Sequence, residues 1–178
     1  MSDRTETMGS WLSQDELDTV RARMPIVYVE AVPVRVNGAG EVEHVGLLLR
    51  VMPDETVSRT VVSGRVLYGE RVRHALLRHL ERDLGPLALP QIPPNPSPFT
   101  IAEYFPEAYI SGYHDPRQHS VSLAYVVPVE GDCEPSQNAL DLTWLTPDEA
   151  VSPEVVGEMT GGHDRLVRLG LAHVGSLP

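Results

Sequence analysis

The sequence predicts a single α/β domain, and three observations support this fold class. Apolar residues recur at spacings of three and four in one stretch, as an amphipathic helix requires: Val72, Ala75, Leu76, Leu80 and Leu84. Runs rich in β-branched residues predict strands at 26–36, 42–52 and 120–129, and the last is apolar enough to be central in its sheet. The length of 178 residues, with 42% hydrophobic and 22% charged residues, suits one globular domain with its own core.

At the amino terminus, residues 1–12 are mainly polar and predict a flexible tail, which leaves 13–178 as the single domain. Ser13 followed by Glu16 has the spacing of a capping box, so we expect a short helix over 14–24.

The next segment has the pattern of a hairpin. The strands at 26–36 and 42–52 are joined by a turn at 37–40 with the sequence Asn-Gly-Ala-Gly. A short extended run at 58–62 then leads into the amphipathic helix.

This helix is expected to begin just after Gly69 and to end at Gly85, a residue that readily adopts the left-handed conformation at helix ends. One face carries a series of basic residues: Arg71, His74, Arg78 and Arg82. Arg65 lies in the preceding glycine-containing loop, and this loop together with the helix start could receive an anion.

The same stretch resembles the box motif of the Nudix hydrolases. The residues that keep the motif's spacing without a gap are Gly64, Glu70, Arg78, Leu80 and Gly85. The resemblance extends over 26–150 and implies the Nudix α/β/α sandwich with a mixed β-sheet. It also implies hydrolysis of a nucleoside diphosphate linked to another group, by attack of metal-activated water on a phosphoanhydride.

The motif's metal-binding glutamates, however, fall on His79, Arg82 and Asp83. Glu70 and Asp83 are therefore the candidates for catalysis, and Glu70, His79 and Asp83 are the candidates for a residual metal site. Such a site would hold magnesium or manganese by resemblance, or no metal at all, because a guanidinium at position 82 repels a divalent cation. In the alternative, His79 packs at the edge of the core and Asp83 pairs with an arginine.

Arg65, Arg78 and Arg82 are candidates for binding phosphate through bidentate hydrogen bonds. The alternative is an internal ion-pair network in which Arg78 holds Glu70. We therefore expect a small anionic ligand that contains phosphate, with weak or absent magnesium-dependent turnover. The rival function is a binding protein without catalysis, for a phosphometabolite or a protein partner, on the same fold.

Beyond the helix, six prolines in 86–98 exclude helix and central strand, and predict an extended loop insertion. A strand at 99–105 precedes a polar turn at 111–119, where a catalytic role competes with an ordinary turn; its candidates are His114, Asp115, Arg117 and His119. Glu103 and Glu107 could add carboxylates to a metal shell.

The last part of the chain predicts a loop at 131–139, a strand at 140–145, and a helix capped by Thr146. Helices are expected at 153–159 and 163–173.

The formal net charge of −11 argues against general binding of nucleic acid, whose phosphates require local positive charge. A single cysteine, Cys133, excludes an intramolecular disulfide and fits a reducing compartment. No signal peptide or membrane span is evident, so we expect a cytoplasmic protein. The apolar carboxy-terminal helix and the proline-rich loop suggest uncovered surface and hence a homodimer.

Overall fold

The structure is a computed structural model that describes residues 11–52, 54–135 and 139–178. Its helices and strands are, in chain order, α1 (Gln14–Arg21), β1 (Ile26–Val36), β2 (Val42–Val51), β3 (Val57–Thr60), β4 (Val62–Arg65), α2 (Val72–Leu84), β5 (Thr100–Phe105), β6 (Tyr113–His114), β7 (Ser120–Pro128), β8 (Ala139–Leu145), α3 (Pro147–Ala150), α4 (Pro153–Val156) and α5 (His163–His173).

The strands form one mixed β-sheet in the order β3-β2-β1-β7-β5-β6, with β4 also paired to β1 and β8 to β2. The β1–β7 and β5–β6 pairs are parallel, and the other pairs are antiparallel. The fold class is therefore confirmed. β7 lies between β1 and β5, so the prediction that 120–129 is a central strand is also confirmed.

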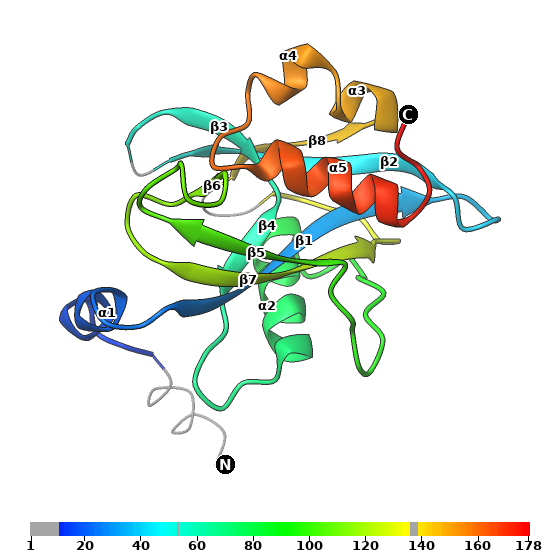
Figure 1. Cartoon of the computed structure of the whole chain (residues 1–178). Helices are drawn as coiled ribbons and strands as arrows, with labels where there is room; N and C mark the ends of the chain where they lie inside the picture. The colour runs from blue at the N-terminus through cyan, green and yellow to red at the C-terminus, as the bar shows by residue number, and fades with distance from the viewer. Residues whose placement is uncertain (1–10, 53, 136–138) are drawn as a thin grey trace, which may run out of the picture.

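β1 changes its antiparallel partner along its length. Tyr28–Ala31 pair with β4, whereas Val34–Val36 pair with β2. Pro33 lies in the gap between the two ladders, where its missing N–H costs no bond to either strand. The sheet consequently divides at this point, and β2 and β4 leave β1 on separate courses (Figure 1).

Two hydrophobic cores cover the opposite faces of the sheet. On one face, α2 buries Ala75, Leu76, Leu80 and Leu84, which confirms the predicted stripe. On the other face, α5 buries Leu166, Val167 and Leu171 against β1, β2, β5 and β7 and leaves Leu169 exposed (Figure 1). In the view of Figure 1, α2 lies below the point where β2 and β4 separate, and α5 lies above it.

The predicted caps are present. Ser13 and Glu16 form a capping box at α1, and Thr146 and Glu149 form another at α3. Gly85 closes α2 with φ 93°, in the region that favours glycine.

Several boundaries differ from the prediction. α1 ends at Arg21 rather than 24, and α4 covers only Pro153–Val156. The run at 58–62 is divided between β3 and β4, and the polar turn at 111–119 contains the short strand β6. The differences among the strands arise where tertiary pairing decides the end of an element, as when β6 joins the edge of β5.

The proline-rich segment 86–98 has no helix or strand, as expected, but is tied to the domain. Gln91 N–H donates to the Pro128 carbonyl, and the Arg73 guanidinium donates to the carbonyls of Ile92 and Pro93. The segment therefore lies along β7 and α2.

The expected tail, 1–12, lies mostly outside the described residues, but Trp11 places its ring 5.5 Å from the Arg78 guanidinium. Within the described part of the chain, no helix has both the length and the apolar character needed to cross a membrane.

Candidate functional site

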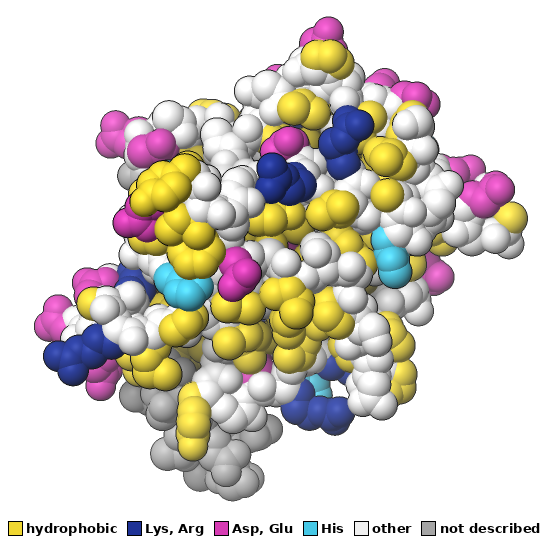
Figure 2. Space-filling view, in the orientation of Figure 1, with side chains coloured by type: hydrophobic (Ala, Val, Ile, Leu, Met, Phe, Trp, Pro, Cys, Tyr) yellow, Lys and Arg dark blue, Asp and Glu magenta, His cyan; other side chains and the backbone are white. Residues whose placement is uncertain are grey.

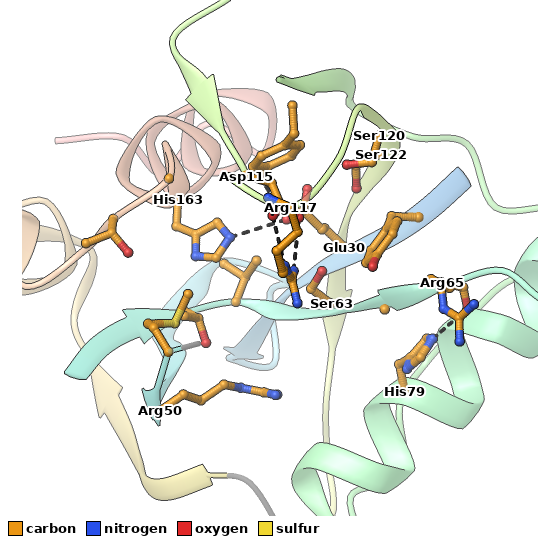
Figure 3. Close-up of a pocket in the computed structure, with 18 of the residues that line it drawn as sticks. Glu30, Arg50, Ser63, Arg65, His79, Asp115, Arg117, Ser120, Ser122 and His163 are labelled. Carbon is orange, nitrogen blue, oxygen red and sulfur yellow. Dashed lines mark hydrogen bonds and ion pairs between the residues drawn. The ribbon is translucent and has the colours of Figure 1, made fainter. Parts of the chain in front are cut away.

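A cavity of about 760 Å³ opens where the sheet divides. Its walls come from strands β1 to β8, from α2, and from residues 160–163 at the start of α5 (Figure 3). Segments distant in sequence thus meet around one space of the size typical for small-molecule sites.

At the α2 end of the cavity, Arg78 holds Glu70 in a bidentate ion pair. Nε donates to Oε1 and Nη2 to Oε2, each at 2.8 Å. Arg78 also donates to the Arg65 carbonyl, and Leu67 N–H donates to Glu70. Burial alone would raise the pKa of Glu70, but the hydrogen bonds from Arg78 and Leu67 hold that pKa below its usual value. Arg78 and Glu70 therefore form the internal network, and Arg78 is committed to the protein rather than to a ligand.

Asp83 is buried between two guanidinium groups. Arg82 donates to both of its oxygens, from Nε to Oδ1 at 2.7 Å and from Nη2 to Oδ2 at 2.9 Å, and Arg50 on β2 donates to Oδ2 as well. Arg82 also donates to the Ser63 carbonyl. Arg50 and Arg82 both line the cavity, so the wall presents their positive charge while the carboxylate lies beneath it.

His79 is buried in the neutral form. Its Nε2 lies 2.9 Å from the Arg65 carbonyl, which can only accept, so Nε2 carries the proton. Burial, with a smaller contribution from the cations of Arg82 and Arg78, lowers the pKa of His79 to about 4. The ring lies directly over Gly64, which has no side chain to obstruct it.

The three candidate metal ligands are thus each engaged elsewhere. Within 11–52, 54–135 and 139–178, no group of three His, Cys, Asp or Glu side chains could hold a metal ion. Glu103 and Glu107, suggested as additional carboxylates, are exposed and do not line the cavity. Glu70, His79 and Asp83 are thus not gathered as a group of three ligands in the described part of the chain, and their role as metal ligands stays a prediction.

Arg65 differs from its neighbours. Its residue lines the cavity, and its guanidinium has no side-chain partner among the described residues, although its carbonyl accepts from both Arg78 and His79. Of the arginines predicted to bind a ligand, Arg65 is the one whose head group is not used by the fold.

The opposite end of the cavity contains residues that sequence analysis missed. Tyr104 donates to Glu30 Oε1 at 2.8 Å, and His163 Nε2 lies 3.4 Å from the same oxygen (Figure 3). Glu30 could have been found, because it is a charged residue within the apolar run of β1 and is only 3% exposed. No comparable signal marks Arg50, which is an ordinary arginine near the end of a strand.

The polar turn before β7 forms part of the rim. Asp115 pairs with Arg117 and accepts from Gln118, and these hydrogen bonds hold the pKa of Asp115 below its usual value although burial opposes this. His114 bonds to the Phe105 carbonyl and His119 stacks on the Phe105 ring. Asp115 therefore has partners other than the histidines, and the pairing expected of a general base with its orienting acid is not present.

The sequence matches one family over residues 7–176, the domain of unknown function DUF4916. A solved structure from Jonesia denitrificans, described as a possible asymmetric diadenosine tetraphosphate (Ap4A) hydrolase, is 58% identical and has a TM-score of 0.85. The match covers 88% of this chain and 98% of that protein. No protein with a curated description matches the sequence.

More distant structures share the fold. The NUDIX domain of Shewanella oneidensis NrtR in complex with ADP ribose is 14% identical with a TM-score of 0.62, and the match covers 98% of this chain and 99% of that one. A C. elegans Ap4A hydrolase in a binary complex is 15% identical with a TM-score of 0.61, over 85% of this chain and 99% of that one. The chain belongs to the DUF4916 family and has the fold of the Nudix superfamily.

Proposed function

We propose that the protein binds a small ligand with linked phosphate groups at the α2 end of the cavity, through arginine rather than through a metal. The observation that carries this proposal is the position of Asp83, whose two oxygens are both taken by Arg82 and Arg50. A carboxylate held in this way neutralises cations of the protein, and its hydrogen bonds to two guanidinium groups compete with coordination of a metal ion.

The balance of charge at this end favours an anion. Arg50, Arg65 and Arg82 line the cavity against two carboxylates, Asp54 in the lining and Asp83 beneath it, while Arg78 and Glu70 cancel each other. Hydrogen bonds to charged groups contribute about 1.5–3 kcal/mol each, so two or three retain a phosphate ligand. The net charge of −11 opposes this only weakly, because salt screens distant charges beyond about 8 Å.

The residues do not fit a magnesium or manganese ion. Such ions require several oxygen ligands, and His79 and Arg82 stand where the family motif has two of its glutamates. The buried His79 ring also directs its protonated nitrogen to the Arg65 carbonyl. We therefore expect that α2 does not bind a metal ion through carboxylates, and that magnesium-dependent hydrolysis is slow or absent.

The class of ligand follows from the fold relatives and from the cavity. The NrtR domain is bound to ADP ribose, and two relatives are described as Ap4A hydrolases. A cavity of about 760 Å³ can accommodate a nucleotide-sized molecule. The ligand we propose is a nucleoside diphosphate linked to another group, or a related phosphoanhydride.

Isothermal titration calorimetry with pyrophosphate and with ADP-ribose tests this proposal. Arg65→Ala should weaken the binding of both ligands about tenfold, which corresponds to one charge-assisted hydrogen bond. Arg71→Ala is the matched control, because it removes the same charge from the exposed start of α2, outside the cavity.

Two results would contradict the proposal. If neither ligand binds the native protein, or if Arg65→Ala and Arg71→Ala behave alike, the cavity is not an anion site and a partner-binding role becomes the better account. Rapid magnesium-dependent turnover that Glu70→Gln abolishes would show instead that a metal site forms.

A further inference from the structure

Four buried polar atoms of residues that line the cavity have no hydrogen-bond partner among the described residues. They belong to four residues that line the cavity, on β1, β3, β7 and the start of α5: Glu30 Oε2, Thr60 Oγ1, Ser122 Oγ and His163 Nδ1. Glu30, Thr60 and Ser122 are 3%, 4% and 1% exposed. Each unsatisfied buried group costs free energy, about 1–3 kcal/mol, so four that line one cavity call for polar partners, which ordered water supplies in the free protein and a ligand can replace.

The chemistry of these atoms defines what could pair with them. Glu30 Oε1 already accepts from Tyr104, so Oε2 remains as an acceptor. If His163 Nε2 donates to Glu30, the other ring nitrogen of His163 is an acceptor too. The hydroxyls of Thr60 and Ser122 can each donate one hydrogen bond and accept others. The cluster therefore needs a group that both donates and accepts.

We propose that this cluster is a subsite for the hydroxyl-bearing, sugar-like end of the ligand. A sugar presents adjacent hydroxyls, each able to donate to Glu30 or His163 and to accept from Ser122 or Thr60. An ammonium group satisfies the carboxylate but offers no acceptor for the two side-chain hydroxyls. A second phosphate is disfavoured, because the carboxylate of Glu30 repels it.

The position of the cluster relates it to the anion site. Glu30 on β1 pairs in register with Ser63 on β4, and the Ser63 carbonyl accepts from Arg82. The two ends of the cavity are thus connected through one pair of strands, and both line the same space. The inference rests on the proposed function for the phosphate end of the ligand and adds the chemistry of its other end.

Entry to the cluster requires a side chain to move, because the four atoms are closed off from water. His163 is the residue to move, since its contact with Glu30 is long, at 3.4 Å, and its second nitrogen has no partner among the described residues. Figure 3 shows its ring directed at Glu30 from the first residue of α5. When His163 moves, a ligand hydroxyl can take its place and donate to Glu30. One long contact of the protein is then exchanged for one hydrogen bond to the ligand.

The test compares ligands with and without a sugar on matched variants. The probes are pyrophosphate, ribose 5-phosphate, ADP-ribose and phosphoethanolamine, titrated by calorimetry into the native protein, Glu30→Gln and Thr60→Val. Both substitutions should weaken the sugar-bearing probes relative to pyrophosphate by about fivefold or more, the effect of one hydrogen bond. Glu103→Gln, at an exposed position of β5, is the control and should leave the ratio unchanged.

The design separates folding from binding. Because the Thr60 hydroxyl makes no hydrogen bond, Thr60→Val should keep or raise the melting temperature, so weaker sugar binding by this variant reports on the subsite. Glu30→Gln removes a negative charge, which by itself would strengthen the binding of every anionic probe. Weaker binding of only the sugar-bearing probes therefore supports the proposal.

The outcomes are distinguishable from failure of the anion site. An unchanged ratio between sugar-bearing probes and pyrophosphate in both variants overturns this inference while the arginine site stands. If phosphoethanolamine binds the native protein more tightly than ribose 5-phosphate does, this inference is overturned in favour of a ligand with an ammonium group. If pyrophosphate fails to bind but ribose alone still perturbs the NMR spectrum in a way that depends on Glu30, the anion site fails and this subsite stands.

Discussion

The His79 imidazole lies on the bare Cα of Gly64. A Cβ atom added at Gly64 would stand 1.9 Å from His79 Cε1, far inside any van der Waals contact. Gly64 on β4 and His79 in the middle of α2 are therefore packed so closely that position 64 has no room for a side chain.

Gly64→Ala should accordingly destabilise the protein by about 1–3 kcal/mol, the usual cost of forcing extra volume into a packed site. Urea unfolding followed by circular dichroism measures this change. Gly38→Ala is the control, because a Cβ there meets no atom within 4 Å. Equal stability of the two variants would show that His79 moves aside without cost.

His79 should also make stability depend on pH. The folded protein holds the pKa of His79 at about 4, below its usual value of 6.5, so between these values the unfolded chain binds a proton that the folded protein does not. Stability from this group is present above pH 6.5 and is lost as the pH falls to 4, by at most about 3 kcal/mol.

The measurement is a series of urea titrations from pH 7.5 to pH 4.5 on the native protein and on His79→Gln. The difference between the two should shrink as the pH falls, because glutamine does not titrate. A constant difference across this range would mean that His79 is not the source of the effect.

Asp83→Asn should be more damaging than a surface change of the same kind. It leaves Arg50 and Arg82 facing each other without their shared counterion, and breaking a buried ion pair in this way costs about 3–5 kcal/mol. Asp18→Asn is the comparison, since Asp18 pairs with Arg21 at the surface and should cost less than about 1 kcal/mol. If the two variants unfold at the same urea concentration, the cluster around Asp83 adds little to stability.

Carboxylates restored to α2 should create affinity for metal. The double variant His79→Glu and Arg82→Glu replaces a buried neutral ring and a cation with oxygen ligands beside Asp83. Titration with manganese should give binding at least about tenfold tighter than for the native protein, with anion binding correspondingly weaker. Equal affinity for manganese in the two proteins would mean that the residues at positions 79 and 82 do not decide whether this helix binds a metal.

The homodimer remains a prediction, with a changed basis. α5, expected to leave apolar surface uncovered, buries Leu166, Val167 and Leu171 against the sheet of its own chain. The exposed apolar side chains that remain include Leu87 in the proline-rich segment and Ile101 on β5. Figure 2 shows hydrophobic side chains gathered across the middle of the face that it draws. Light scattering should give twice the 19.6 kDa monomer mass, and a monomer at micromolar concentration would contradict the prediction.

The fold could be predicted largely from sequence because its signals are local. The spacing from Gly64 to Gly85 predicted both α2 and its apolar stripe, and the capping boxes at Ser13 and Thr146 predicted the starts of two helices. β6 was missed because two residues at a sheet edge have no periodicity of their own.

The site could be predicted only in part, since its partners come from distant strands. The pairing of Arg78 with Glu70 follows from motif spacing, but Arg50 reaches Asp83 from 33 positions away, and nothing in the sequence links them. Glu30 and His163 are likewise joined only by the fold. The sequence therefore located the α2 end of the cavity and left the other end unseen.

The change of partner along β1 bears on how the cavity can respond to a ligand. β1 is paired with β7 from Ile26 to Val34 while its other edge carries β4 and then β2, so its backbone bonds open only when the domain unfolds. The amide hydrogens of β1, which forms the floor of the cavity at Tyr28 and Glu30, should therefore exchange with solvent as slowly as any in the protein, with or without ligand. Selectivity then depends on a fixed floor to which the incoming molecule must conform, and only side chains such as His163 adjust.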